Sequence, residues 1–115
     1  MAETFGCSYR CVNFDEIYKK CQGIAKENYK IEPKFSEEGG SQRMDLALQN
    51  IQARTRMVLS YFLASLELEI RNISGFLLVL GSVNLDETLR GYYTKYDCSA
   101  SDVNPIGSFS KYRLR

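Results

Sequence analysis

The first third of the chain alternates between patterned and unpatterned stretches. Residues 8–14, SYRCVNF, alternate polar with apolar or aromatic side chains, a period of two that predicts a short β-strand. Asp15 follows directly and can cap a helix, which we expect to run to about Lys26. Residues 28–42 carry Pro33 and a Gly-Gly pair, so this stretch predicts a long connection and no regular element.

The longest periodic stretch is residues 45–71, which contain neither proline nor glycine. Apolar side chains recur there at steps near three and four, the period of an amphipathic helix; they include Leu48, Ile51, Val58, Phe62 and Leu66. Gly75 interrupts the pattern, and residues 76–80, FLLVL, are apolar at every position. A strand that is apolar on both faces is typical of a parallel sheet covered by helices. The order of elements therefore predicts an α/β fold with right-handed crossovers.

Polar side chains follow the predicted core strand. Ser82 stands at its carboxyl end, which in open parallel sheets is the edge where ligands bind. Asp86 and Glu87 fall in the first turn of the next helix, where carboxylates cap the helix or bind a magnesium ion. The spacing of these two carboxylates along the chain, taken alone, favours helix capping over magnesium binding. Further on, Ser110 predicts the cap of a helix that begins at Lys111.

Composition narrows the class of protein. A chain of 115 residues with 44% hydrophobic content can form one domain with a core, and a net charge of +1 gives no overall attraction to nucleic acid. No apolar segment reaches the length of a membrane span, and residues 1–10 lack the core of a secretory signal, so we expect a cytoplasmic protein that binds no membrane. The chain has no histidine, and we expect reduced structural thiols and no zinc site at Cys7, Cys11, Cys21 and Cys98.

Four motifs occur in a fixed order along the second half of the chain. They are Gln-Ala-Arg-x-Arg-Met at 52–57, Leu-Gly-Ser-x-Asn-x-Asp-Glu at 80–87, Thr-Lys-Tyr-Asp at 94–97, and Asp-x-Asn-Pro-Ile-Gly at 102–107 followed by Ser-Lys at 110–111. Together they resemble the synthetase domain of glutamine-dependent NAD synthetases of the eukaryotic type. The resemblance covers residues 39–115, the half that holds substrate and ATP sites, whereas residues 1–38 match only through a strand and a helix in the expected order. It implies an incomplete, doubly wound Rossmann-like sheet of the adenine nucleotide alpha hydrolase type.

The same resemblance implies a reaction and its site residues. The family uses ATP to convert deamido-NAD to NAD through an adenylate, with ammonia as the final nucleophile and Mg²⁺ as cofactor. By motif, the resemblance implies ATP contacts at Ser82 and Lys111, deamido-NAD contacts at Arg54, Lys95 and Asp102, and a magnesium ligand at Glu87. Ammonium and guanidinium groups suit phosphate and carboxylate oxygens. Without the resemblance, isolated charges of this kind would be read as solvated helix surface.

Two parts of the family pattern are missing from this sequence. The Ser-Gly-Gly-x-Asp-Ser loop, which cradles pyrophosphate, does not occur, and Gly39-Gly40 cannot replace it because Ser-Gln and a long helix follow. The glutaminase domain that supplies ammonia is also missing. We therefore expect a fragment with little or no turnover on its own, and a homo-oligomer because family members pair across the helix around Arg54. The alternative is a non-catalytic nucleotide-binding or assembly module derived from the domain.

Overall fold

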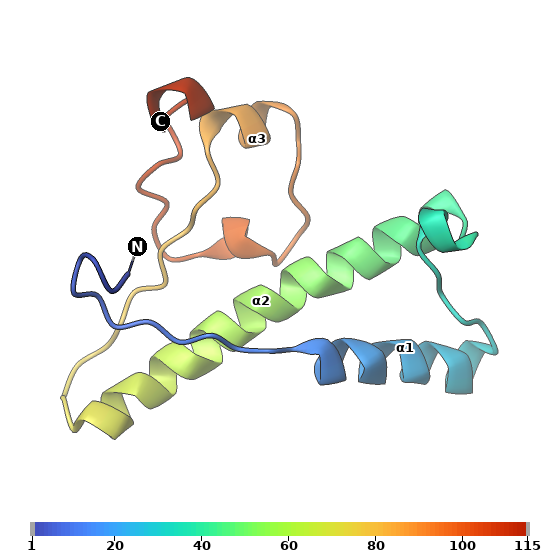
Figure 1. The fold of residues 1–115 in the computed structure, drawn as a ribbon, viewed down its shortest axis with the longest axis horizontal. Helices are drawn as coiled ribbons and strands as arrows, with labels where there is room; N and C mark the ends of the chain where they lie inside the picture. Colours follow the sequence, from blue (N-terminus) through green and yellow to red (C-terminus); the bar gives the residue numbers. More distant parts are fainter. Residues whose placement is uncertain (1, 115) are drawn as a thin grey trace.

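The structure is a computed structural model that describes residues 2–114. Within these residues there are three α-helices: α1 (Asp15–Tyr29), α2 (Gln42–Arg71) and α3 (Leu85–Leu89). Short 3-10 turns form at Ser36–Glu38, Cys98–Ala100 and Lys111–Leu114. The long α2 crosses the whole molecule, with α1 along one side of it and the segment that carries α3 on the other (Figure 1).

Both long helices that the sequence predicts are present, with shifted ends. α2 begins at Gln42, a little earlier than expected, because the Ser41 hydroxyl accepts the amide of Met44 at 3.3 Å and caps it. Helix α1 begins at Asp15, but Asp15 is not its cap. The N-cap position is Phe14, which makes no side-chain capping bond, and the amide of Asp15 donates to the side chain of Asn13 at 2.9 Å, so the prediction that Asp15 caps the helix was wrong.

The connection predicted over residues 28–42 is shorter in the structure and is ordered. It runs from Lys30 to Ser41 and contains the 3-10 turn. Its carbonyl at Pro33 accepts the side-chain amide of Gln22 at 3.3 Å, and its Phe35 ring stacks on Tyr18 with ring centroids 6.4 Å apart. The connection therefore packs back onto α1.

Neither predicted strand forms within residues 2–114. Residues 8–14 are extended without a ladder, and the apolar run 76–80 makes a single parallel bridge, from Leu80 to Val103. Phe76 is 81% exposed. A strand exists only through hydrogen bonds to its neighbours, and this chain supplies pairing residues only for the end of the run. Its hydrophobic pattern is that of a buried strand, but residues 76–78 and 80 are exposed in the structure.

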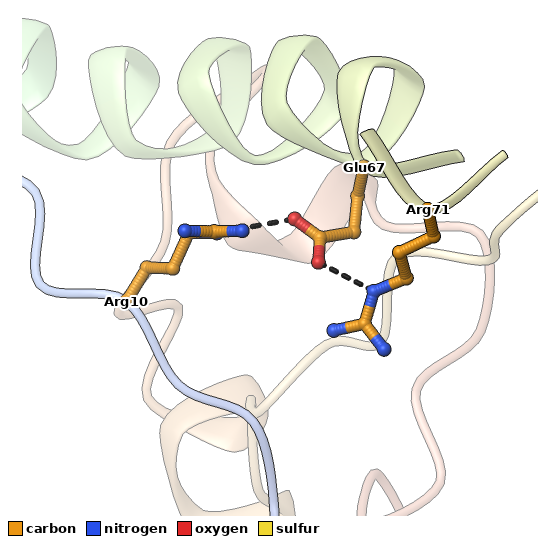
Figure 2. Close-up of polar contacts among 3 residues, drawn as sticks. All are labelled: Arg10, Glu67 and Arg71. Carbon is orange, nitrogen blue, oxygen red and sulfur yellow. Dashed lines mark hydrogen bonds and ion pairs between the residues drawn. The ribbon is translucent and has the colours of Figure 1, made fainter. Parts of the chain in front are cut away.

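Charged and aromatic contacts hold the extended N-terminal segment on α2. Figure 2 shows the Glu67 carboxylate between two guanidinium groups, with Arg10 Nε 3.1 Å from Oε2 and Arg71 Nε 2.6 Å from Oε1. Hydrogen bonds from Arg71 and then Arg10 lower the pKa of Glu67. Nearby, the guanidinium of Arg56 lies 5.5 Å from the centre of the Phe14 ring. These contacts replace the ladder that the alternating pattern predicted.

Few side chains are buried in the described part of the chain. Leu48 and Met57 on α2 are the buried apolar residues, and the buried polar ones are Thr55, Asn84 and Asp97. Of the apolar positions predicted for α2, Val58 is 65% exposed. No helix in residues 2–114 has the length and apolar character needed to cross a bilayer. Buried polar groups therefore have a large part in fixing the segment beyond α2.

Candidate functional site

Two segments run side by side in the same direction on one side of α2: residues 79–86 and residues 102–111. Hydrogen bonds join them along their length; the pairs are Asp102 N with Val79 O (3.0 Å), Gly81 N with Val103 O (2.7 Å), Asn104 Nδ2 with Val83 O (2.7 Å) and Leu85 N with Phe109 O (3.0 Å). The pairing places the Leu-Gly-Ser motif beside the Asp-x-Asn-Pro motif. Three of the six predicted site residues lie where these segments reach α3.

The N-terminus of α3 is built by a capping box. The side chain of buried Asn84 accepts the amide of Glu87 at 3.1 Å, and the Glu87 carboxylate accepts the amide of Asn84 at 3.2 Å. Ser82 is exposed two residues before this cap. Asp86 accepts the backbone amide of Lys111 at 2.7 Å. Of the residues assigned to ATP and magnesium, Glu87 lies in the first turn of α3, Lys111 is bound to that turn through its backbone amide, and Ser82 precedes the cap by two positions.

The terminal element differs from its prediction. Lys111–Leu114 is one 3-10 turn, and Arg115 lies outside the described residues. The element begins at Lys111, as predicted, and the Lys111 amide donates to the carboxylate of Asp86. So short an element is stabilised by its contact with α3, since a single turn does not stand alone.

The residues assigned to deamido-NAD are all tied to α2. Arg54 donates from Nε to the carbonyl of Lys95 at 2.9 Å and from Nη2 to the hydroxyl of Thr94 at 3.0 Å. Tyr61 lies on the same face of α2 as Arg54, two turns further along the helix, and its hydroxyl lies 3.0 Å from Asp102 Oδ1. Burial, followed by the hydrogen bond and the charge of Asp102, raises the pKa of Tyr61. Two of the three side-chain nitrogens of Arg54, Nε and Nη2, hold the loop.

Asp97 organises the loop that carries Lys95. Its buried carboxylate accepts the amide of Thr94 at 2.9 Å and both the amide and the hydroxyl of Ser99, at 2.8 and 2.6 Å. Burial alone raises the pKa of Asp97, but the hydrogen bonds from Ser99 and Thr94, with the nearby charge of Arg54, outweigh it and lower the pKa below its ordinary value. Asp97 is therefore ionised at neutral pH.

Three residues that shape the site were not assigned a role from the sequence. Asn84 stands three positions before Glu87, the spacing of a capping box, and that signal could have identified it. Tyr61 follows Arg54 by seven positions and so shares its helix face, which is a weaker signal. Asp97 lies inside a recognised motif, but nothing in the sequence indicated that its carboxylate is buried.

An open cavity of about 390 Å³ lies between α2 and residues 91–98. Its lining includes Gln49, Asn50 and Arg56 from the helix and Tyr92, Tyr93 and Thr94 from the facing segment. None of the six predicted site residues is part of this lining. Thr94, which is part of the lining, nevertheless connects two of them to the cavity. Arg54 donates a hydrogen bond to the Thr94 hydroxyl, and Lys95 is the next residue in the chain. The volume and the mixture of aromatic and amide groups suit an organic ligand.

The described residues contain no cluster of three or more aspartate, glutamate, cysteine or histidine side chains that could hold a metal ion. All four cysteines are free thiols, and Cys7 and Cys11 are exposed. Magnesium, however, often binds one or two carboxylates together with substrate phosphates and water. Glu87 uses Oε2 for the capping box, so Oε1 is left for such an ion. A single carboxylate of this kind fits a metal that enters with a polyphosphate.

Comparison with known proteins identifies the class to which this fold and site belong. The NAD synthase family matches residues 1–115, so the chain belongs to that family, and the resemblance carried by the four motifs is confirmed. The match extends over residues 1–38 as well.

Particular relatives are glutamine-dependent NAD(+) synthetases. Those of Dictyostelium discoideum and Homo sapiens are 52% and 50% identical to this chain over 115 residues, which is all of the chain and 16% of each relative. Among solved structures, an NH3-dependent NAD synthetase from Campylobacter jejuni, in complex with the nitrate ion, matches with a TM-score of 0.70 and 26% identity. That match covers 98% of this chain and 39% of the other. The chain therefore spans about a sixth of the length of its curated relatives.

Proposed function

We propose that this chain is the part of a glutamine-dependent NAD synthetase that supplies one half of its ATP and deamido-NAD sites. The observation that carries the proposal is the separation of the predicted residues into two groups. Glu87 and the backbone of Lys111 are bound at the first turn of α3, which Ser82 precedes in the chain, whereas Arg54 on α2 donates to the carbonyl of Lys95. The identity of about half of all positions to glutamine-dependent synthetases supports the same function. The proposed compartment is the cytoplasm, and the proposed assembly is a homo-oligomer.

The reaction accounts for two neighbouring groups of this kind. The nicotinate carboxylate of deamido-NAD attacks the α-phosphate of ATP and releases pyrophosphate, and ammonia then displaces AMP from the adenylate to give NAD. Both substrates are anionic, so cations must offset their repulsion while the reacting atoms are held in line. The proposed cations are Lys111 at the ATP phosphates, and Arg54 and Lys95 at deamido-NAD. Ammonia is proposed to come from a glutaminase domain that this sequence does not contain.

The doubly wound sheet is part of the proposal. Residues 76–80 have the apolar pattern of a central parallel strand, and Leu80 already makes one parallel bridge. In a longer polypeptide of this family, neighbouring strands would cover Phe76 and its neighbours and complete the ladder. The carboxyl end of that strand leads directly into Ser82, which would then stand at the edge where open parallel sheets bind ligands.

Substitution of Glu87 separates its capping role from the proposed magnesium role. Glu87→Gln is expected to preserve the helix, because glutamine also completes a capping box, and to weaken binding of Mg²⁺-ATP about tenfold through loss of the carboxylate charge. Titration calorimetry with ATP, in the presence and absence of Mg²⁺, measures the change. Glu16→Gln, in the first turn of α1, is the matched control. Equal affinities in the two variants would refute the metal role and leave only capping.

A chimera tests catalysis directly. The chain replaces the matching 115 residues of the Dictyostelium discoideum synthetase, to which it is 52% identical, and NAD and AMP formation are measured with ATP, Mg²⁺, deamido-NAD and glutamine. An active chimera that loses activity on Lys111→Ala is the expected result, because removal of a phosphate-binding cation removes transition-state stabilisation. A folded chimera that binds ATP without forming AMP would favour the non-catalytic module.

The chain alone provides the complementary measurement. With Mg²⁺, ATP, deamido-NAD and an ammonium salt, we expect nucleotide binding with little or no AMP release, because the pyrophosphate-binding loop is missing from this sequence. Sustained AMP release that depends on deamido-NAD would show that these 115 residues suffice. Absence of binding by either nucleotide would count against the proposed function itself.

A further inference from the structure

Tyr61 holds a carboxylate that is proposed to contact substrate. Its hydroxyl lies 3.0 Å from Asp102 Oδ1 and 3.1 Å from the carbonyl of Ala100. The other oxygen of Asp102 accepts the backbone amide of Val79 at 2.8 Å, and the amide of Asp102 donates to the carbonyl of Val79 at 3.0 Å. The Asp102 side chain is therefore fixed from two directions, by a helix on one side and by the paired segment on the other.

Such fixation is unusual for an exposed acid. Asp102 is exposed, and an exposed carboxylate ordinarily samples several rotamers in water. A carboxylate has about four lone-pair positions, of which Tyr61 and Val79 use two. The remaining positions can accept hydrogen bonds from a ligand. The contacts thus orient the carboxylate without exhausting its capacity to accept.

Helix α2 fixes the segment that carries Asp102 at both of its ends. Arg54 holds Thr94 and Lys95, and Tyr61 holds Ala100 and Asp102. The two helix residues are seven positions apart, which is two turns, or about 10 Å along the axis. One rigid helix face therefore sets the spacing between the two residues, Lys95 and Asp102, that are proposed to contact deamido-NAD.

We infer that Tyr61 is a positioning residue of the deamido-NAD site, which holds Asp102 in the one orientation that accepts a hydrogen bond from a hydroxyl or amino group of the dinucleotide. The inference rests on the proposed function. Tyr61 itself does not contact the substrate and acts through Asp102. Its hydroxyl is the atom that the role requires, because that hydroxyl makes the contacts with Asp102 and with the carbonyl of Ala100.

Tyr61→Phe removes that hydroxyl alone. In the 115-residue chain, we expect the Kd for deamido-NAD to increase by roughly fivefold to tenfold. This is the effect of losing one hydrogen bond to a charged group when water partly replaces the lost donor. The Kd for Mg²⁺-ATP is expected to change by less than about twofold, because the hydrogen bonds of the Tyr61 hydroxyl go to Ala100 and Asp102 and not to Ser82, Glu87 or Lys111. Calorimetric titration with each nucleotide measures both constants, and circular dichroism verifies that the variant is folded.

Tyr9→Phe is the matched control. Its hydroxyl also donates to a carboxylate, Glu3 Oε1 at 3.0 Å, in the N-terminal segment. We expect this variant to bind both nucleotides as the parent chain does. A Tyr61→Phe chain that binds deamido-NAD like the control would overturn the inference and leave the proposed function intact. Equal losses for deamido-NAD and ATP would also overturn it, since they would indicate general loosening. A parent chain that does not bind deamido-NAD would overturn the proposed function together with the inference.

Discussion

Replacement of Asp97 by alanine is expected to lower the free energy of unfolding by about 3 kcal/mol. The buried carboxylate accepts three hydrogen bonds, one from the amide of Thr94 and two from Ser99. Alanine leaves these donors without a partner and removes the negative charge that faces Arg54. Because the donors belong to the loop held on α2, the loop and the packing of residues 91–102 on the helix should loosen together.

Urea unfolding followed by circular dichroism measures this change. Asp86→Ala is the matched control, since that carboxylate accepts one amide, from Lys111, at the surface. The control is expected to lose roughly 1 kcal/mol or less, in keeping with a single exposed hydrogen bond. If both variants unfold at the same urea concentration, Asp97 does not organise the loop as the structure indicates.

The same carboxylate gives the chain a pH dependence of definite sign. The folded-state pKa of Asp97 lies below its ordinary value of 3.8, so the folded state binds this proton less readily than the unfolded state. The stabilisation is therefore fully present above about pH 4 and is lost as the pH falls through the folded-state pKa. Asp45 and Glu67, whose pKa values are also lowered, contribute in the same direction. The difference between the parent chain and Asp97→Ala should therefore shrink below about pH 4.

The helices could be predicted because their causes are local. Residues 45–71 contain no breaker and keep a helical period, so α2 could be predicted without knowledge of its neighbours. The strand at residues 76–80 has an equally clear pattern but depends on partners, and only Leu80 finds one. Residues 8–14 fail for the same reason, since Arg10 and Phe14 are held by the side chains of α2 and not by a ladder. A hydrophobic pattern indicates what a segment could bury, whereas its structure depends on what covers it.

The candidate site shows the same division between local and distant causes. The motifs indicated which residues to group, and the position of Glu87 in the first turn of the predicted helix favoured a capping role, which the capping box with Asn84 confirms. The tether from Arg54 to Thr94 spans 40 positions, and the contact of Tyr61 with Asp102 spans 41. The periodicity of a sequence does not predict contacts between residues so far apart along the chain. The positions of Lys95 and Asp102 therefore depend on pairings that only the folded chain reveals.

The pairing of residues 79–86 with 102–111 depends on a position where no side chain fits. Gly81 is buried, and a Cβ built on it would lie 2.4 Å from the Ser101 hydroxyl and 3.3 Å from the Asn104 side chain. Its φ is not in the left-handed region, so the requirement is for space and not for backbone freedom. Gly81→Ala is expected to lower the free energy of unfolding by about 2 kcal/mol, as overpacking of a tight contact does.

A second substitution tests whether this steric contact is the cause. Ser101→Ala removes the nearest clashing atom, so the double variant Gly81→Ala, Ser101→Ala should recover about half of the loss, with the contact at Asn104 still tight. Gly23→Ala is the control in α1, where a Cβ meets no neighbour, and it should stabilise the chain by about 0.5 to 1 kcal/mol because alanine favours a helix. Urea unfolding of the four chains measures all of these values. Recovery of stability in the double variant is the decisive result. A loss of stability from any other cause would persist when the serine hydroxyl is removed. In that case the close approach that brings Ser82 beside the Asp-x-Asn-Pro motif would need another explanation.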